Sequence, residues 1–317
     1  MQDILAEVLA AVEPYRGEGK VADYIPALAR VDPHKFGIAF AGEDGVVHGV
    51  GDSDDPFSIQ SISKVFTLAL ALRRVGRDLW HKVGREPSGS AFNSIVQLER
   101  ESGKPRNPLI NAGAIATTGQ LIGGRTADAA IDELLAFLRE QARDEDVAVD
   151  ELVARSESET GSRNRSLAWF MRNYSIVEGD VETVLGAYFR QCAIAMSCRQ
   201  LARAGLFLAF DGCDPATGQE VTAWHNARRI NSVMMLCGHY DNSGEFAYRI
   251  GLPGKSGVGG GILAIAPGHG AVAVWSPGLN QYGTSAVGTR ALEHLIDCTG
   301  WSVFAPPGGP GQRQAAD

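Results

Sequence analysis

The chain has 317 residues, 44% of them hydrophobic and 21% charged, which is typical of a globular protein with a large core. Its net charge of −8 predicts an acidic surface and argues against nucleic acid or an anionic membrane as the main partner. No apolar run approaches the roughly 18 residues of a membrane-spanning helix, and the first residues lack the pattern of a secretory signal. The five cysteines include no Cys-x-x-Cys pair, so we expect free thiols in a cytoplasmic protein.

The N-terminal part of the chain combines helical and strand patterns. Apolar residues at helical spacing predict an amphipathic helix over residues 3–13. Residues 36–50 contain two short apolar segments around a Gly42–Gly45 turn, which is typical of a β-hairpin. The acidic residues 52–56 end this hairpin, and a helix is expected from residues 58–61 to Gly76.

The middle of the chain is predicted to be mainly helical. Thr126 can cap a helix whose apolar residues line one face, and residues 181–210 should form two more buried helices. The charged segment 140–150 is expected to be solvated.

The strand pattern returns after residue 245. Residues 245–252 are read as a strand, followed by a glycine-rich turn over 254–261. Residues 262–266 and 271–275 predict a second hairpin, and 285–296 a closing helix.

This order of elements predicts an α/β (α+β) fold in which one antiparallel sheet is built from both chain ends and is flanked by helices. We expect a single catalytic domain over residues 1–302. Its sheet lobe would comprise about 20–60 and 225–300, and a helical lobe of about 61–225 would be inserted between them. The tail 303–317, rich in Pro, Gly and Gln, is predicted to be disordered.

The segment Ser61-Ile-Ser-Lys64 fits the Ser-x-x-Lys pattern of acyl-enzyme hydrolases. Residues three apart lie on the same face of a helix, so the hydroxyl and the amine can meet. Burial would lower the pKa of Lys64 and allow its neutral amine to accept the serine proton. A four-residue pattern is short, so it indicates an acyl-enzyme hydrolase only in combination with a second motif.

The segment Lys255-Ser-Gly257 is that second motif. In penicillin-recognising enzymes, Lys-Thr/Ser-Gly lies on a strand beside the nucleophile. Here it leads into Val258 and further glycines, a suitable place for an oxyanion-binding backbone amide. Lys255 could be catalytic or could only shape this loop. The third motif of that group, Ser-Asp-Asn, is absent, so another group must handle the proton of the leaving group.

With further blocks, these motifs resemble the serine-dependent glutaminase family, whose fold is β-lactamase/transpeptidase-like. The resemblance covers roughly residues 20–300, in family order. The blocks that carry it are Ala22-Asp-Tyr24-Ile-Pro26, Gln60-Ser61-Ile-Ser-Lys64, Asn107-Pro-Leu-Ile-Asn111-Ala-Gly-Ala-Ile115, Ser156-Glu157, Gly161-Ser-Arg-Asn164, Tyr188-Phe189, Cys237-Gly-His-Tyr240 and Lys255-Ser-Gly-Val258-Gly-Gly-Gly-Ile262. The resemblance implies hydrolysis of L-glutamine to L-glutamate and ammonia, by a homo-oligomer (dimer or tetramer).

The resemblance also implies roles for individual residues. Ser61 would be the nucleophile and Lys64 its base, while the backbone amides of Ser61 and Val258 would form the oxyanion hole. Tyr240 would relay a proton to departing ammonia, and either Tyr240 or Lys64 would activate the deacylating water. The implied substrate-binding shell consists of Tyr24, Ser61, Asn111, Glu157, Asn164, Tyr188, Tyr240 and Val258.

These residue types suit free glutamine. Its α-ammonium needs a buried anion, and Glu157 is the sole acid of the shell. Its α-carboxylate needs hydrogen-bond donors, which Tyr24, Asn111 and Asn164 can supply.

No cofactor and no catalytic metal are expected. The seven histidines are scattered, without a His-x-x-x-His pair, and the glycine-rich stretches lack a phosphate-binding Gly-x-x-x-x-Gly-Lys-Ser/Thr motif. Two other functions stay open at this point. A penicillin-recognising hydrolase is opposed by the missing Ser-Asp-Asn and the missing export signal. A non-catalytic glutamine sensor is opposed by the presence of both Ser61 and Lys64.

Overall fold

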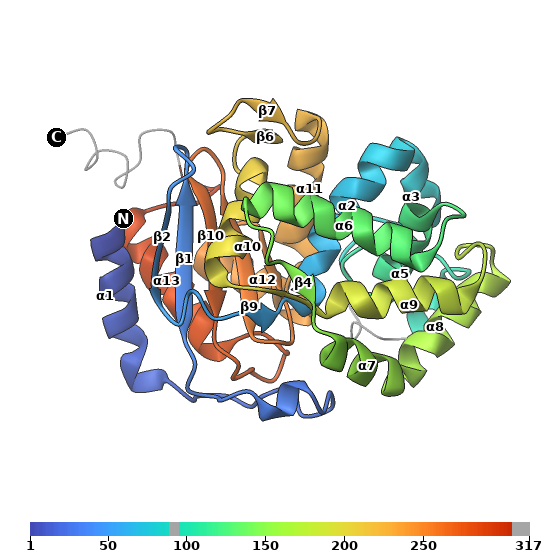
Figure 1. Cartoon of the computed structure of the whole chain (residues 1–317), viewed down its shortest axis with the longest axis horizontal. Helices are drawn as coiled ribbons and strands as arrows, with labels where there is room; N and C mark the ends of the chain where they lie inside the picture. Colours follow the sequence, from blue (N-terminus) through green and yellow to red (C-terminus); the bar gives the residue numbers. More distant parts are fainter. Residues whose placement is uncertain (89–94, 306–317) are drawn as a thin grey trace.

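The computed structural model describes residues 1–88 and 95–305. Figure 1 shows a helix-covered sheet on one side of the molecule and a lobe of helices on the other. No helix among the described residues has the length and apolarity needed to cross a bilayer.

A five-stranded antiparallel sheet joins the two ends of the chain, as predicted. Its order is β2-β1-β10-β9-β8, so a strand from the N-terminal hairpin lies beside one from the C-terminal hairpin (Figure 1). Gly37 pairs with Trp275 and Gly42 with Gly270 along this central contact. The strands are β1 (Gly37–Gly42), β2 (Val47–Gly51), β8 (Gly254–Ser256), β9 (Gly261–Ala266) and β10 (Gly270–Trp275).

Helices cover both faces of this sheet because side chains alternate along each strand. Ile38 and Phe40 pack in the apolar cluster that includes α1 (Gln2–Val12) and α13 (Ala286–Thr299). Ala39 and Ala41 face the opposite cluster, where α10 (Cys198–Gly205) contacts β1 and β10. Small alanine side chains allow α10 to approach the strands closely.

The segment 245–252 is not a strand, and this prediction is wrong. It lies in α12 (Ser243–Ile250), which Gly251 ends in the left-handed conformation at φ 68°. Phe246 and Ile250 pack in the same cluster as α13, whereas Tyr248 between them is 88% exposed. A strand would place all three side chains on one face, and a helix does not. The first part of the predicted glycine-rich turn is likewise strand β8.

The helical lobe surrounds α2 (Ser63–Val75), whose residues 63–72 are all buried. The predicted helix begins with a 3-10 turn, η3 (Gln60–Ile62), and Thr126 caps α6 by accepting a hydrogen bond from the Ala129 amide. The other helices are α3 (Leu79–Lys82), α4 (Ile95–Arg100), α5 (Asn111–Ile122), α6 (Ala127–Ala142), α7 (Glu151–Glu159), α8 (Ser162–Asn173), α9 (Val181–Cys192) and α11 (Trp224–Cys237). Further 3-10 turns are η1 (Glu13–Tyr15), η2 (Leu28–Arg30), η4 (Gly76–Asp78), η5 (Leu206–Leu208) and η6 (Tyr240–Asn242).

Two small sheets complete the fold. One has the order β3-β5-β4, and the other pairs β6 with β7. Their strands are β3 (Phe57–Ser58), β4 (Ala148–Val149), β5 (Ile194–Met196), β6 (Cys213–Asp214) and β7 (Gln219–Glu220). The segment 140–150 is therefore only partly solvated: Gln141 and Val147 are buried, while Glu145 and Asp146 are exposed.

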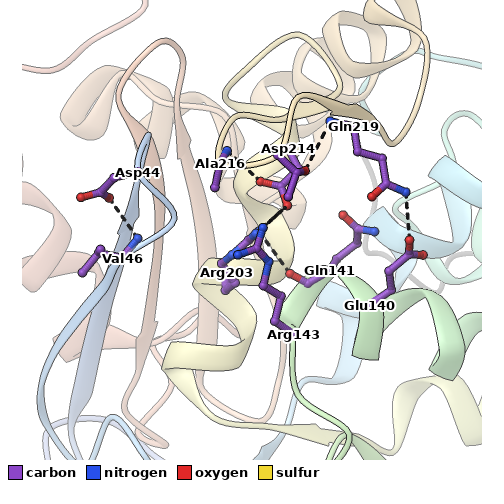
Figure 2. A network of polar contacts seen from close by, with 10 residues as sticks. Asp44, Val46, Glu140, Gln141, Arg143, Arg203, Asp214, Ala216 and Gln219 are labelled. Atoms are coloured by element: carbon purple, nitrogen blue, oxygen red, sulfur yellow. Dashed lines mark hydrogen bonds and ion pairs between the residues drawn. The ribbon is translucent and has the colours of Figure 1, made fainter.

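A buried ion pair ties the helical lobe to the covered sheet. Arg203 of α10 contacts the Asp214 carboxylate of β6 at 2.6 Å and donates a hydrogen bond to the Gln141 carbonyl at 3.3 Å (Figure 2). Arg143, just after α6, contacts the same carboxylate at 3.2 Å. Burial opposes ionisation of Asp214, but its contacts with Arg203 keep the pKa of the carboxyl below its ordinary value.

At the C-terminal end of the described part, Val303–Ala305 form a turn, and the Val303 amide donates to the Gly251 carbonyl at 2.9 Å. The rest of the predicted disordered tail, residues 306–317, lies outside the described residues.

Candidate active site

A pocket of about 140 Å³ lies between the helical lobe and the β8–β9 turn. It is lined by all eight residues that were expected to bind substrate: Tyr24, Ser61, Asn111, Glu157, Asn164, Tyr188, Tyr240 and Val258. Lys64 does not line the pocket, but it contacts the lining through Asn111. Residues from widely separated segments of the chain thus converge on one cavity.

Ser61 is held in the turn that connects β3 to α2. The Ile59 amide donates to the Ile194 carbonyl at 2.9 Å, which fixes the start of this turn on β5. Gln60 then adopts a positive φ of 50°, a conformation in which non-glycine residues are uncommon. The Ser61 side chain consequently faces the pocket, where its hydroxyl hydrogen-bonds to the Tyr240 hydroxyl.

Two glycines of the β8–β9 turn allow it to lie directly against the segment before Ser61. A Cβ atom at Gly257 would approach the Ile59 carbonyl oxygen to 2.5 Å, and one at Gly259 would approach the Ser58 carbonyl oxygen to 2.3 Å. The Gly260 amide closes the turn by donating a hydrogen bond to the Gly257 carbonyl at 3.0 Å. This arrangement brings the Val258 backbone to the same pocket as Ser61.

Lys64 lies one helical turn beyond Ser61 and is almost completely buried. Its Nζ donates to the Asn111 Oδ1 at 2.7 Å and to the Leu109 carbonyl at 3.4 Å, and Asn111 in turn donates to the Asn164 Oδ1 at 3.1 Å. Burial lowers the pKa of Lys64 to about 8, although the nearby Glu157 opposes this shift. A sizeable neutral fraction of the amine therefore exists at mildly alkaline pH.

Glu157 lies on α7 and is also buried. Burial raises the pKa of its carboxyl to about 7, while a hydrogen bond from Gln60 and the charge of Lys64 act in the opposite direction. These neighbours compensate the carboxylate charge only in part. The pocket therefore offers a favourable position for a cationic group of a ligand.

Tyr240 is held by the segment that follows α11. Its φ of 55° is again positive, and burial raises the pKa of its hydroxyl to about 12, although the hydrogen bond with Ser61 opposes this. Lys255 lies 4.5 Å from the centroid of the Tyr240 ring, and its Nζ donates to the carbonyls of Gly238 and Ser256 at 2.8 and 2.6 Å. Lys255 does not line the pocket, so the geometry favours its role in shaping the loop.

The two remaining tyrosines occupy different depths. Tyr24 is 55% exposed and lies at the rim, on a segment held by Ile25 and Leu28 in a small apolar cluster that includes Val258. Tyr188 of α9 is buried, and its hydroxyl hydrogen-bonds to Cys192.

Residues that were not predicted as site residues also line the pocket: Ile25, Gln60, Thr160, Gly161, Arg163 and Cys192. Gln60 is notable among them because it hydrogen-bonds both Glu157 and the Ser58 hydroxyl. Its position directly before the Ser-x-x-Lys motif could have identified it as a site residue from the sequence. The contribution of Cys192 depends on the packing of α9 and has no such local signal.

Comparison with known proteins identifies the family. A sequence model described as glutaminase matches residues 19–304. Over 304 residues the chain is 61% identical to a glutaminase of Rhizobium rhizogenes, covering 96% of this chain and 98% of that protein. The chain belongs to the glutaminase family.

Solved glutaminase structures have the same fold. The probable glutaminase ybaS superposes with a TM-score of 0.90 at 38% identity, covering 96% of this chain and all (100%) of that one. Mglu in its glutamate form superposes with a TM-score of 0.91 at 36% identity, covering 96% of this chain and 70% of that one. The family and the β-lactamase-like fold predicted from the sequence are confirmed.

Proposed function

We propose that this member of the glutaminase family hydrolyses L-glutamine to L-glutamate and ammonia through an acyl-enzyme on Ser61. The observation that carries the proposal is the convergence of the Ser61 hydroxyl, the Tyr240 hydroxyl and the buried Glu157 carboxylate on one small pocket. The solved glutamate form of Mglu supports a ligand of this size and charge for the family fold.

The pocket can hold both charged ends of a free amino acid. Glu157 would accept hydrogen bonds from the α-ammonium, and the partial compensation of its charge makes this contact favourable. Donors from Tyr24, Asn111 and Asn164 would bind the α-carboxylate. With both charges fixed, the length of the glutamine side chain places the γ-amide at Ser61.

In the acylation step, the Ser61 Oγ attacks the amide carbon while its proton passes to the neutral amine of Lys64. The carbonyl oxygen becomes an oxyanion that accepts hydrogen bonds from the amides of Ser61 and Val258. The C–N bond then breaks, and the proton reaches the departing nitrogen through Tyr240, which releases ammonia and leaves a γ-glutamyl ester. This sequence uses Lys64 near its shifted pKa, where general-base catalysis is most effective.

In the deacylation step, a water molecule attacks the ester and returns the proton to Ser61 as glutamate leaves. Tyr240 and Lys64 are both candidates for the base. Tyr240→Phe separates them when the substrate is an activated γ-glutamyl ester, whose leaving group needs no proton from Tyr240. This variant should accumulate acyl-enzyme if Tyr240 is the deacylation base, and should not if Lys64 is.

The resemblance also leads us to propose a cytoplasmic homo-oligomer, dimer or tetramer, with one catalytic domain over residues 1–302. Light scattering of the purified protein measures the number of subunits, and limited proteolysis followed by mass spectrometry measures the extent of the resistant domain.

Ammonia release tests the function. The purified protein is assayed with L-glutamine, L-asparagine and a chromogenic β-lactam, beside Ser61→Ala and the control Ser162→Ala, an exposed serine near the pocket. We expect release from glutamine that only Ser61→Ala abolishes, and formation of γ-glutamyl hydroxamate when hydroxylamine replaces water.

Other outcomes would reject the proposal. Turnover of the β-lactam alone would indicate a penicillin-recognising hydrolase. No turnover of any of the three compounds, together with a melting temperature that glutamine still raises, would indicate a non-catalytic sensor. Activity retained by Ser61→Ala would exclude the proposed nucleophile.

A further inference from the structure

Three side chains of metal-ligating type meet on the outer helices of the sheet lobe. Glu7 belongs to α1, whereas His294 and Cys298 belong to α13. Each offers one ligand atom, and these atoms all lie within 4.8 Å of one another. Because His294 and Cys298 are four residues apart, they share one face of α13, and the packing of α1 against α13 brings Glu7 opposite them.

The distances within this cluster approach those of a tetrahedral zinc site. The His294 Nε2 lies 3.5 Å from the Glu7 Oε1, and the Cys298 Sγ lies 3.7 Å from the same oxygen. Zinc bonds of about 2.0 Å to nitrogen and oxygen and about 2.3 Å to sulfur, at tetrahedral angles, imply ligand separations of about 3.3 and 3.5 Å. Both pairs therefore need to close by only a few tenths of an ångström.

The histidine nitrogen is also without a hydrogen bond. The His294 Nε2 is shielded from solvent and makes no hydrogen bond within residues 1–88 and 95–305, which is unusual for a buried polar atom. The side chains as wholes remain accessible, since that of His294 is 33% exposed and that of Glu7 is 63% exposed. An ion can thus reach the cluster and keep a water molecule as a further ligand.

We propose that Glu7, His294 and Cys298 bind one Zn²⁺ ion, with water as the fourth ligand. The carboxylate and the thiolate supply two negative charges that balance the ion, and the thiol proton is released to solvent on binding. Neither α1 nor α13 contributes a residue to the catalytic pocket. The ion therefore clamps the N-terminal helix to the C-terminal helix and takes no part in the reaction.

Metal titration of the full-length protein tests this inference. ZnCl₂ is titrated by calorimetry in metal-free buffer with a non-thiol reductant, and CoCl₂ is used as a spectroscopic probe. We expect one ion per chain, a thiolate-to-cobalt absorption band, proton release and a higher melting temperature with Zn²⁺.

Three variants and a control assign the ligands. Glu7→Gln, His294→Ala and Cys298→Ser should each weaken Zn²⁺ binding at least about tenfold, and Cys298→Ser should lose the cobalt band. Cys213→Ser, which removes another partly exposed free cysteine, should leave binding unchanged. Ammonia release should be the same in all four variants.

Wild-type binding weaker than about 1 mM would overturn the inference. Equal affinity in the wild type and in all three ligand variants would also overturn it, because the ion would then lie elsewhere. Circular dichroism of each variant without metal shows whether a loss of binding reflects the ligand rather than the fold.

Discussion

Arg203 and Asp214 are buried to a similar extent as Lys64 and Glu157, but the pKa values of the two sets respond differently to burial. Arg203 and Asp214 are 4% and 7% exposed, and Lys64 and Glu157 are 1% and 8% exposed. In the first pair, direct contact at 2.6 Å keeps the carboxylate ionised (Figure 2). In the second pair, burial lowers the pKa of the lysine to about 8 and raises that of the glutamate to about 7.

This contrast distinguishes a structural ion pair from a reactive site. Buried charges in direct contact with a counter-charge hold their protonation states and tie elements of the fold together. Buried charges that lack full compensation titrate near neutral pH, which suits groups that accept a proton or a ligand charge. Variants at the two pairs should therefore separate activity from stability.

The largest effect is expected at Lys64. Lys64→Met should lower kcat/KM on the order of 10³-fold, because the base that accepts the serine proton is lost. Stability to urea should stay equal or increase, because an incompletely compensated buried amine is replaced by an apolar side chain. In the wild type, kcat/KM should rise with pH through about 8 and level off above it, as Lys64 becomes neutral. A variant that keeps activity within about tenfold would contradict this role.

At the paired cluster, the expectation is reversed. Asp214→Asn should reduce the free energy of unfolding by about 3–5 kcal/mol, because it leaves the buried Arg203 without its counter-charge. The activity of the protein that remains folded should change little. Arg143→Ala is the matched control: it removes the more exposed partner of the same carboxylate and should cost less than about 1 kcal/mol. Urea denaturation and kcat are measured on each variant. An equal loss of unfolding free energy in Asp214→Asn and Arg143→Ala would show that the uncompensated charge of buried Arg203 does not destabilise the fold.

The Glu157→Gln variant tests substrate binding. It should raise KM for glutamine about 100-fold, since a charge-assisted hydrogen bond to the α-ammonium is worth about 1.5–3 kcal/mol. The value of kcat should fall less than kcat/KM. Steady-state kinetics measure both, and an unchanged KM with a large fall in kcat would instead place Glu157 in the chemical step.

The pH dependence of stability gives a smaller effect at the same residue. The pKa of Glu157 rises from 4.5 to about 7 on folding, so the folded state binds more protons than the unfolded chain between these values. Its contribution to stability therefore falls as pH rises through this window, by about 2 kcal/mol between about pH 5 and 7. Urea unfolding at these two pH values measures the loss of stability in the wild type and in Glu157→Gln. The wild type should lose about 2 kcal/mol more than the variant. Equal losses in the two proteins would show that Glu157 is not the titrating group.

Lys64 should act with the opposite sign. Its pKa falls from 10.5 to about 8 on folding, so its contribution to stability rises with pH between these values. The free energy of unfolding of the wild type and of Lys64→Met, measured between about pH 8 and 10.5, isolates this contribution, which only the wild type should show.

Periodic segments with local partners could be predicted from the sequence. The hairpins 36–50 and 262–275 each contain two short apolar runs around a turn, and α2 has a long apolar pattern, so the sheet from both chain ends was predicted correctly. The prediction for the short segment 245–252 is wrong, because Phe246, Tyr248 and Ile250 alternate as in a strand, although the segment folds as α12. Packing of Phe246 and Ile250 in the cluster that includes α13 selects the helix over the strand.

The site was predictable for a different reason. The Ser61–Lys64 spacing and the glycines after Lys255 suggested local geometry, whereas the substrate shell came from the family resemblance. No local signal connects Arg203 with Asp214, or Glu7 with the end of α13, because these contacts depend on how distant helices pack. Long-range polar contacts of this kind are the part of the molecule that the sequence alone could not supply.

The pairing of Gly42 with Gly270 also has a consequence for synthesis on the ribosome. At typical rates of translation, β1 emerges on the order of ten seconds or more before the strand that completes its ladder. During this interval one edge of the N-terminal hairpin has no partner, and unpaired edges are sites of aggregation. The Val258 amide is also made long after Ser61, so the nascent chain cannot complete its oxyanion hole until the last strands are translated. Catalytic competence should therefore appear only after β9 and β10 have been made, and C-terminal truncation before β9 should leave an inactive, aggregation-prone product.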